Sequence, residues 1–215
     1  MPDTIFVINP NSLRLATEAI AHAIAPFEGK ANLHFEFVTF DHGPPGIVTL
    51  RDAERAAPLV TDFVEARKDE AAGFIVACYS DPGVFASREV AAVPVVGIGE
   101  AGLGQACEAG RRVGVIAISS KAIERHWRSY HAWGFARHIA GERAIDLAVD
   151  ESGDENLALA RLIRTGRDLR DIDGADAVVL GCAGMATLRD KVSQALGMPV
   201  VEPCAAAAGK MLRLL

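Results

Sequence analysis

The chain has 215 residues, of which 50% are hydrophobic and 23% are charged. It can therefore bury a sizeable core, either as one domain or as two lobes of about a hundred residues each. A formal net charge of -6 at pH 7 argues against a nucleic-acid partner, which a basic surface would attract. The segment MPDTIFVINPNS has neither the basic region nor the apolar stretch of a secretion signal, and nowhere do about 18 apolar residues run without interruption. We therefore expect a cytoplasmic protein with no membrane or nucleic-acid partner.

Eight short apolar segments, most of them rich in valine and isoleucine, alternate with longer segments of helix-forming composition. This alternation predicts an α/β fold in which parallel strands are flanked by helices. The expected strands are, in chain order, residues 4–8, 34–40, 73–77, 93–98, 112–118, 143–149, 176–181 and 198–203. The expected helices are residues 12–25, 53–70, 101–110, 120–133, 154–172, 184–196 and 204–215.

The two halves of the sequence are similar to one another. The segment GFIVACYSDPG is echoed by DAVVLGCAGMA, which aligns Cys78 with Cys182. A Pro-Val-Val segment follows each cysteine at nearly the same spacing, beginning at Pro94 and Pro199. Upstream, FVINPNS and VIAISSK both lead from an apolar strand into small polar residues. A repeated unit of this length indicates a duplicated βαβ architecture.

We predict two similar lobes with parallel sheets, related by a pseudo-twofold axis. The first lobe comprises residues 1–97, completed by the C-terminal helix 204–215, and the second comprises residues 98–203. Open α/β sheets bind ligands at the carboxyl ends of their strands. Cys78 and Cys182, each at such an end, are therefore expected to face one another across the cleft between the lobes.

Two like acid-base groups on opposite sides of a ligand suit the inversion of a carbon stereocentre. One thiolate removes the proton from one face, and the other thiol returns a proton to the opposite face. A helix N-terminus after each cysteine is expected to lower the thiol pKa. Backbone N–H groups near Ser80, Ala183 and Gly184 would then hold the oxygen of an enolate intermediate.

The segments INPNS, ACYSDPG, PVVGIGEA and VVLGCAGMA also resemble the hydantoin racemase group of the aspartate/glutamate racemase superfamily. The resemblance implies a racemase that needs no cofactor or metal, works as a homo-oligomer and acts on a small molecule, either a 5-substituted hydantoin or an allantoin-like ureide. It implies Cys78 and Cys182 as the acid-base pair. It also implies ligand contacts from Asn9 and from the backbone around Ser80 and Ala183–Gly184, and the predicted substrate-binding set is completed by Asn11, Tyr79 and Ser119.

The sequence departs from the family pattern on two loops that we expect to face the substrate. Gly46, Ile47 and Val48 stand where the pattern has a serine and a glutamate, and Ala117 and Ile118 stand where hydroxyl residues are common. Because both loops are expected to contact the substrate, these departures leave open which ring the enzyme binds and which substituent the ring carries.

Several features also have structural explanations. Cys107 and Cys204 fit packing positions, Asn9 fits a cap of the following helix, and Asp81 fits a turn. The histidine-rich and tryptophan-rich segment 126–138 reads as an amphipathic helix or a subunit contact. A zinc site of two cysteines and a histidine lacks the usual close ligand spacing.

Two other functions fit the same residues. A decarboxylase or cis-trans isomerase of the same superfamily would use a cysteine to protonate or attack its substrate, and a decarboxylase needs only one of the two. A non-catalytic protein would simply close its lobes on a small molecule. Two thiols at the cleft favour the racemase over both.

Overall fold

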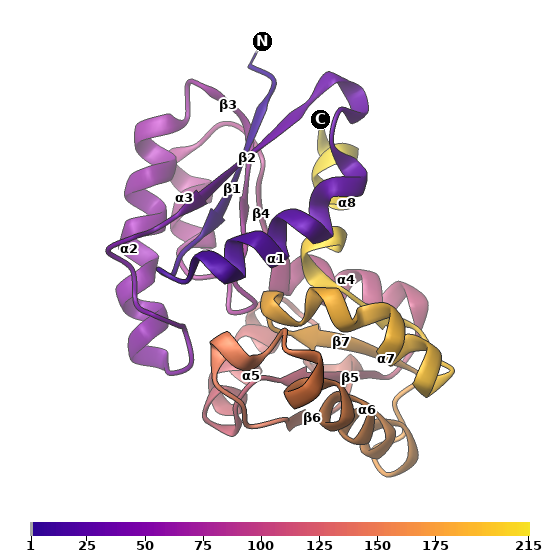
Figure 1. Ribbon diagram of the computed structural model, residues 1–215. Coiled ribbons are helices and arrows are strands. Elements are labelled where there is room, and N and C mark those ends of the chain that lie inside the picture. Colours follow the sequence, from indigo (N-terminus) through magenta and orange to yellow (C-terminus); the bar gives the residue numbers. More distant parts are fainter. Residues whose placement is uncertain (1) are drawn as a thin grey trace.

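The computed structural model describes residues 2–215 and contains two four-stranded parallel sheets flanked by helices (Figure 1). The first sheet has the order β2-β1-β3-β4, from β1 (Thr4–Asn9), β2 (His34–Thr39), β3 (Ala71–Val76) and β4 (Val95–Gly97). The second has the order β6-β5-β7-β8, from β5 (Val113–Ala117), β6 (Ile139–Ala144), β7 (Ala177–Gly181) and β8 (Val200–Val201). The two sheets therefore repeat one topology, as the internal similarity of the sequence predicted.

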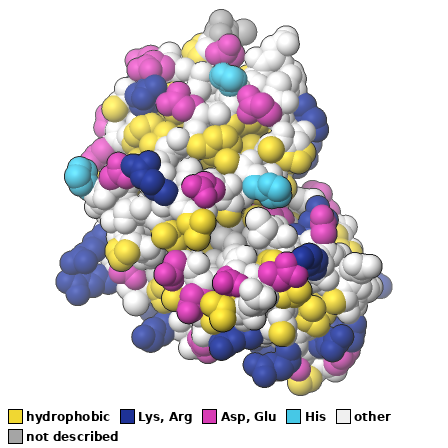
Figure 2. All heavy atoms as spheres, viewed as in Figure 1, with side chains coloured by type: hydrophobic (Ala, Val, Ile, Leu, Met, Phe, Trp, Pro, Cys, Tyr) yellow, Lys and Arg dark blue, Asp and Glu magenta, His cyan; other side chains and the backbone are white. Residues whose placement is uncertain are grey.

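A helix follows each strand, so that each half of the chain runs β-α-β-α-β-α-β-α. The helices are α1 (Arg14–Ile24), α2 (Leu50–Arg67), α3 (Val84–Val90), α4 (Ile98–Ala109), α5 (Ile123–Ala132), α6 (Glu155–Asp171), α7 (Arg189–Leu196) and α8 (Pro203–Leu214). Within residues 2–215, no helix combines the length and the apolar character needed to cross a membrane. On the face seen in Figure 2, basic side chains are interspersed with acidic ones.

Strands β1, β3 and β4 of the first sheet are almost entirely buried, which explains their nearly continuous apolar sequence, whereas the edge strand β2 is partly exposed. Phe6 and Ile8 of β1 point into a cluster with Val60 and Val64 of α2. Alternate residues of β1 point to the opposite face, where Ile20 and Ile24 of α1 and Met211 of α8 cover the sheet. Helix α2 begins at a capping box, in which the Asp52 N–H donates to Thr49 Oγ1 at 3.2 Å and the Thr49 N–H donates to Asp52 Oδ2 at 2.8 Å.

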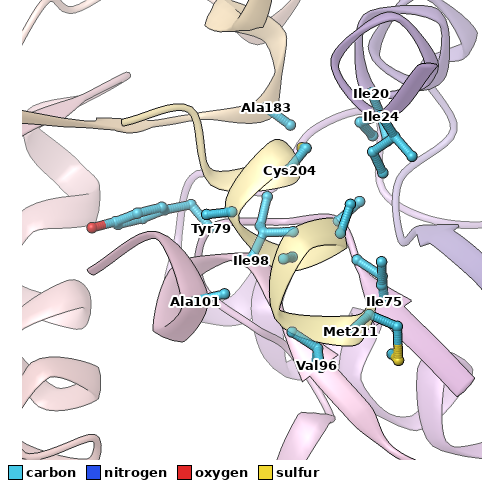
Figure 3. Packing of buried hydrophobic residues seen from close by; sticks show 14 of the residues in the cluster. Ile20, Ile24, Ile75, Tyr79, Val96, Ile98, Ala101, Ala183, Cys204 and Met211 are labelled. Carbon is cyan, nitrogen blue, oxygen red and sulfur yellow. The ribbon is translucent and has the colours of Figure 1, made fainter. Parts of the chain in front are cut away.

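Helices α4 and α8 join the two halves around one core. They pack against each other, while α4 also contacts β7 and α8 also contacts β3 and β4. Figure 3 shows Met211 of α8 beside Ile75 and Val96 of the first sheet, and Cys204 of the same helix near Ala183 of the second half. The shared core fixes β3 and β7 relative to one another, so their carboxyl ends reach one place. The lobe boundaries at residues 97 and 203 stay a prediction.

The structure corrects one local prediction and gives the bounds of another. Strand β6 covers residues 139–144 instead of 143–149, because it is an edge strand that pairs only with β5 and its half-exposed side chains give no apolar signal. The apolar Ile145 follows the strand and packs into the core, and the chain then turns at Asp146, which has a φ of 47°. Helix α3 is the helix expected after Cys78, for which no range was predicted; its seven residues begin after Gly83, whose φ of 75° suits glycine.

Candidate active site

The two cysteines occupy equivalent places in the repeated fold. Cys78 comes directly after β3 and Cys182 directly after β7, and each of these strands lies inside its sheet. Both line one small cavity of about 40 Å³. Its other walls are Asn11, Ala16, Ile47, Ala77, Tyr79, Ser80, Ile118, Arg125, His126, Val149, Gly181, Ala183 and Gly184. Residues that are 104 positions apart in the chain are thus brought to one site.

Cys78 has polar neighbours that favour its thiolate. Its Sγ lies 3.3 Å from Ser80 Oγ, within hydrogen-bonding range for sulfur. Burial raises the pKa of the Cys78 thiol above its ordinary value of 9.0, while hydrogen bonding to Ser80 and the positive charge of Arg125 act in the opposite direction.

Cys182 is harder to ionise. Its Sγ lies 3.9 Å from Ser152 Oγ, a longer contact than that of Cys78. Burial raises the pKa of Cys182 to about 11, and the nearby Cys78 adds to the increase, while the Gly184 N–H opposes it. The expectation that the helix N-termini lower the thiol pKa values is therefore wrong, because desolvation outweighs the backbone donors at both cysteines.

The two predicted asparagines have different surroundings. Asn9 does not line the cavity; its Nδ2 donates to the Leu13 carbonyl at 3.1 Å and to Thr17 Oγ1 at 2.9 Å. Its Oδ1 accepts a hydrogen bond from the Asn11 N–H at 3.3 Å. The Asn9 amide therefore holds the connection between β1 and α1, while Asn11 itself lines the cavity.

Ser119 and Asp81 lie outside the walls of the cavity. Ser119 Oγ accepts from the Lys121 N–H at 3.3 Å and so caps a short 3-10 turn. Asp81 accepts from the Gly99 and Glu100 N–H groups, both at 2.8 Å, at the start of α4. The structural interpretation of Asp81 is thus confirmed.

Tyr79 connects the cavity to a buried aromatic and ionic cluster. Its hydroxyl lies 3.5 Å from the Tyr130 hydroxyl, and its ring meets the edge of the His126 ring at 5.1 Å between centroids. His126 Nδ1 lies 2.6 Å from Glu142 Oε1, with both side chains almost fully buried. Burial lowers the pKa of His126, while the hydrogen bond to Glu142 acts in the opposite direction. His126 is a cavity residue that the sequence had suggested only for a helix or subunit contact.

Known proteins share both the sequence and the fold. The family model described as Asp/Glu/Hydantoin racemase matches residues 5–211. The chain belongs to this family. The hydantoin racemase of Rhizobium meliloti is 34% identical over 207 residues, which cover 94% of this chain and 85% of that protein. The solved allantoin racemase from Klebsiella pneumoniae has a TM-score of 0.90 at 32% identity, covering 98% of this chain and 86% of that chain.

A more distant member of this fold is arylmalonate decarboxylase, whose crystal structure has a TM-score of 0.68. It is 21% identical and covers 98% of this chain and 92% of that chain. At this level of identity the comparison shows a shared fold alone. Membership of the Asp/Glu/hydantoin racemase family confirms the predicted enzyme class, an isomerase of the racemase type.

Most of the predicted site residues line the cavity that contains the two cysteines. They are Cys78, Cys182, Asn11, Tyr79, Ser80, Ala183 and Gly184. Their roles in catalysis and binding stay predictions. Cys204 is buried in the shared core, and Cys107 is half-buried in α4. Among residues 2–215, no three His, Cys, Asp or Glu side chains are grouped as metal ligands would be. The independence from metals and cofactors and the homo-oligomer stay predictions.

Arg125 and Ser152 are site residues that the sequence did not indicate directly. Arg125 lies in the polar segment that forms α5, and it is only 7% exposed. Ser152 follows a short 3-10 turn and is 1% exposed. The sequence offered one indirect indication of Arg125. Helix α5 follows β5 as α1 follows β1, so the internal repeat places α5 beside the site.

Proposed function

We propose that the chain racemises 5-substituted hydantoins or allantoin-like ureides by two-base proton transfer between Cys78 and Cys182. The observation that carries this proposal is that two thiols, delivered by equivalent strands of a duplicated fold, line one cavity. The substrate class is supported by relatives named hydantoin racemase and allantoin racemase at more than 30% identity.

The contacts of the two thiols favour one starting state. Cys78 has Ser80 and Arg125 to favour its thiolate, whereas Cys182 has a pKa of about 11 and stays protonated. The Cys78 thiolate removes the hydrogen on the carbon next to the carbonyl group. The electron pair of the broken C–H bond moves into an enolate, whose negative oxygen is held by backbone N–H groups near Ser80 and Gly184.

The second proton transfer completes the inversion. The Cys182 thiol gives its proton to the opposite face of the same carbon, and the enolate returns to the carbonyl form. Cys78 is then a thiol and Cys182 a thiolate, which is the correct arrangement for the other enantiomer. The free enzyme returns to its starting state by exchanging protons with water.

The alternatives within the fold make different demands on the site. A decarboxylase needs a proton donor on one face only, so the second thiol would have no role. A binding protein without chemistry needs neither. Two thiols in a cavity of about 40 Å³ are therefore best explained by a reaction that uses both faces of one carbon.

The direct test is loss of optical activity. Circular dichroism of enantiopure 5-methylhydantoin and of enantiopure allantoin should decay toward zero with the enzyme, faster than in an enzyme-free blank, because hydantoins also racemise spontaneously. Cys107→Ser, which alters a thiol outside the cavity, is the matched control and should leave the rate unchanged. Optical activity that decays no faster than in the blank, for every ureide tried, would overturn the proposal.

A further inference from the structure

Arg125 is a buried cation with unused hydrogen-bonding capacity in the wall of the cavity. One of its terminal nitrogens, Nη2, donates to the Val48 carbonyl at 3.3 Å. Its Nε and Nη1 are buried, and neither has a hydrogen-bond partner among residues 2–215. The Arg125 side chain lines the same cavity as Cys78 and Cys182.

The acidic groups near Arg125, Asp52 and Glu142, make no hydrogen bond or salt bridge with it among residues 2–215. Asp52 Oδ2 accepts hydrogen bonds from Val48, Thr49 and the Thr49 hydroxyl at the start of α2. Glu142 contacts His126 through Oε1, while its Oε2 is buried without a hydrogen-bond partner among residues 2–215. In the part of the chain that the structure describes, Arg125 forms no salt bridge, although a buried charge without a partner is costly.

The rest of the wall supplies no other arginine or lysine. Its one histidine, His126, is in contact with Glu142. Ile47, Ile118 and Val149 give the wall a largely apolar character. A guanidinium in such surroundings binds a planar anion with two acceptor oxygens far better than it binds a neutral group.

We propose that Arg125 binds a carboxylate on the substituent of the substrate ring, so that the enzyme prefers hydantoins whose 5-substituent ends in a carboxylate. This inference rests on the proposed racemase function. The enolate oxygen is a less suitable partner, since it forms only during the reaction and has backbone donors of its own. A permanent carboxylate instead neutralises Arg125 throughout the reaction cycle. One of its oxygens accepts from the unpartnered Nε or Nη1, and the other accepts from the N–H of Nη2 that does not bind Val48.

The test compares two substrates of nearly equal shape, 5-(carboxymethyl)hydantoin and its neutral amide, 5-(carbamoylmethyl)hydantoin. The wild-type enzyme should have a kcat/KM about 10- to 100-fold higher for the carboxylate, the range expected of a charge-assisted hydrogen-bonded pair. Arg125→Met keeps the length of the side chain without its charge and should lower this ratio to about 1. Arg128→Met is the matched control, because Arg128 lies on the same helix but is exposed and paired with Glu124, and it should leave the ratio unchanged.

Arg125→Lys keeps the charge but loses the two-nitrogen fork, so it should retain part of the preference for the carboxylate. This variant also serves if Arg125→Met does not fold, which thermal unfolding will show. The inference is overturned if the wild-type enzyme does not prefer the carboxylate, or if Arg125→Met lowers the rates of both substrates equally. An equal loss for both substrates would mean that Arg125 binds the hydantoin ring or stabilises the Cys78 thiolate, and not the substituent.

A binding measurement separates this inference from the proposed function. Isothermal titration of the wild-type protein and Arg125→Met with each hydantoin, added as the racemate so that no net reaction occurs, reports binding alone. Tighter binding of the carboxylate that depends on Arg125, without racemisation, would contradict the reaction while supporting this assignment. Racemisation of 5-methylhydantoin, with no Arg125-dependent preference in either assay, would support the reaction and overturn the assignment.

Discussion

Gly184→Ala should damage both stability and activity, because the added methyl group has no room. A Cβ atom at Gly184 would lie 2.1 Å from Ser152 Oγ and 3.4 Å from Ser152 Cβ. The Ser152 hydroxyl cannot move freely, since it donates to the Val149 carbonyl at 2.7 Å and contacts Cys182. Either this hydroxyl rotates and gives up its hydrogen bond, or the turn after Cys182 shifts.

Both responses have a known range of cost. Overpacking a closed site costs about 1–3 kcal/mol, and losing one hydrogen bond costs about 0.5–1.5 kcal/mol. We therefore expect the free energy of unfolding to fall by about 2 kcal/mol. Because the displaced atoms lie beside the Cys182 thiol and the Gly184 N–H, we also expect kcat/KM to fall by about 10- to 100-fold.

A double variant isolates the cause. Ser152→Ala removes the oxygen of the 2.1 Å contact and leaves a neighbour at 3.4 Å, an ordinary contact. Gly184→Ala with Ser152→Ala should therefore be more stable than Gly184→Ala alone, by about 1 kcal/mol or more. Gly104→Ala is the control, because its nearest neighbour is Phe135 Cζ at 3.7 Å and alanine favours the helix. Urea unfolding followed by circular dichroism measures all four variants, and a Gly184→Ala protein with wild-type stability and rate would refute this reasoning.

Two further predictions concern pH and metals. Burial raises the pKa values of both thiols. We therefore expect kcat/KM to rise with pH from 7 to 9 as Cys78 ionises, and to fall only near pH 11, where Cys182 loses its proton. A kcat/KM that is flat or falls between pH 7 and 9 would contradict this. Since the two thiols are proposed to supply both proton transfers, dialysis against EDTA should leave the racemisation rate unchanged, whereas a loss that zinc restores would contradict the thiol mechanism.

The sequence predicted the parts of the fold whose residues carry a strong local pattern. Buried strands such as β3 and β7 are continuous apolar runs, and all their side chains are buried. The edge strand β6 has residues IAGERA, whose half-exposed side chains resemble a loop in composition, so its position was misjudged. The cysteine pair was found because the duplication places Cys78 and Cys182 at equivalent strand ends.

The rest of the site depends on packing between segments that are distant in the sequence. Arg125 and Arg128 are three residues apart on α5, yet the first is buried in the cavity wall and the second is exposed. Nothing in their residue type or local sequence distinguishes them. The thiol pKa values were misjudged for the same reason, since the degree of desolvation depends on the closed cavity and not on the helix that follows each cysteine.

The central claim is that Cys78 and Cys182 serve opposite faces of one carbon, and hydrogen exchange in deuterated water tests it most directly. Cys78→Ser and Cys182→Ser should each abolish racemisation, because a serine hydroxyl is far too weak an acid to replace a thiol. The remaining thiol should still exchange the hydrogen on its own face with retention of configuration, as long as backbone donors hold the enolate. Proton NMR of each pure enantiomer of a racemised hydantoin, with Cys107→Ser as the control, should therefore show the two variants exchanging opposite enantiomers. Exchange of the same enantiomer by both variants, or undiminished racemisation by either, would contradict the two-base account.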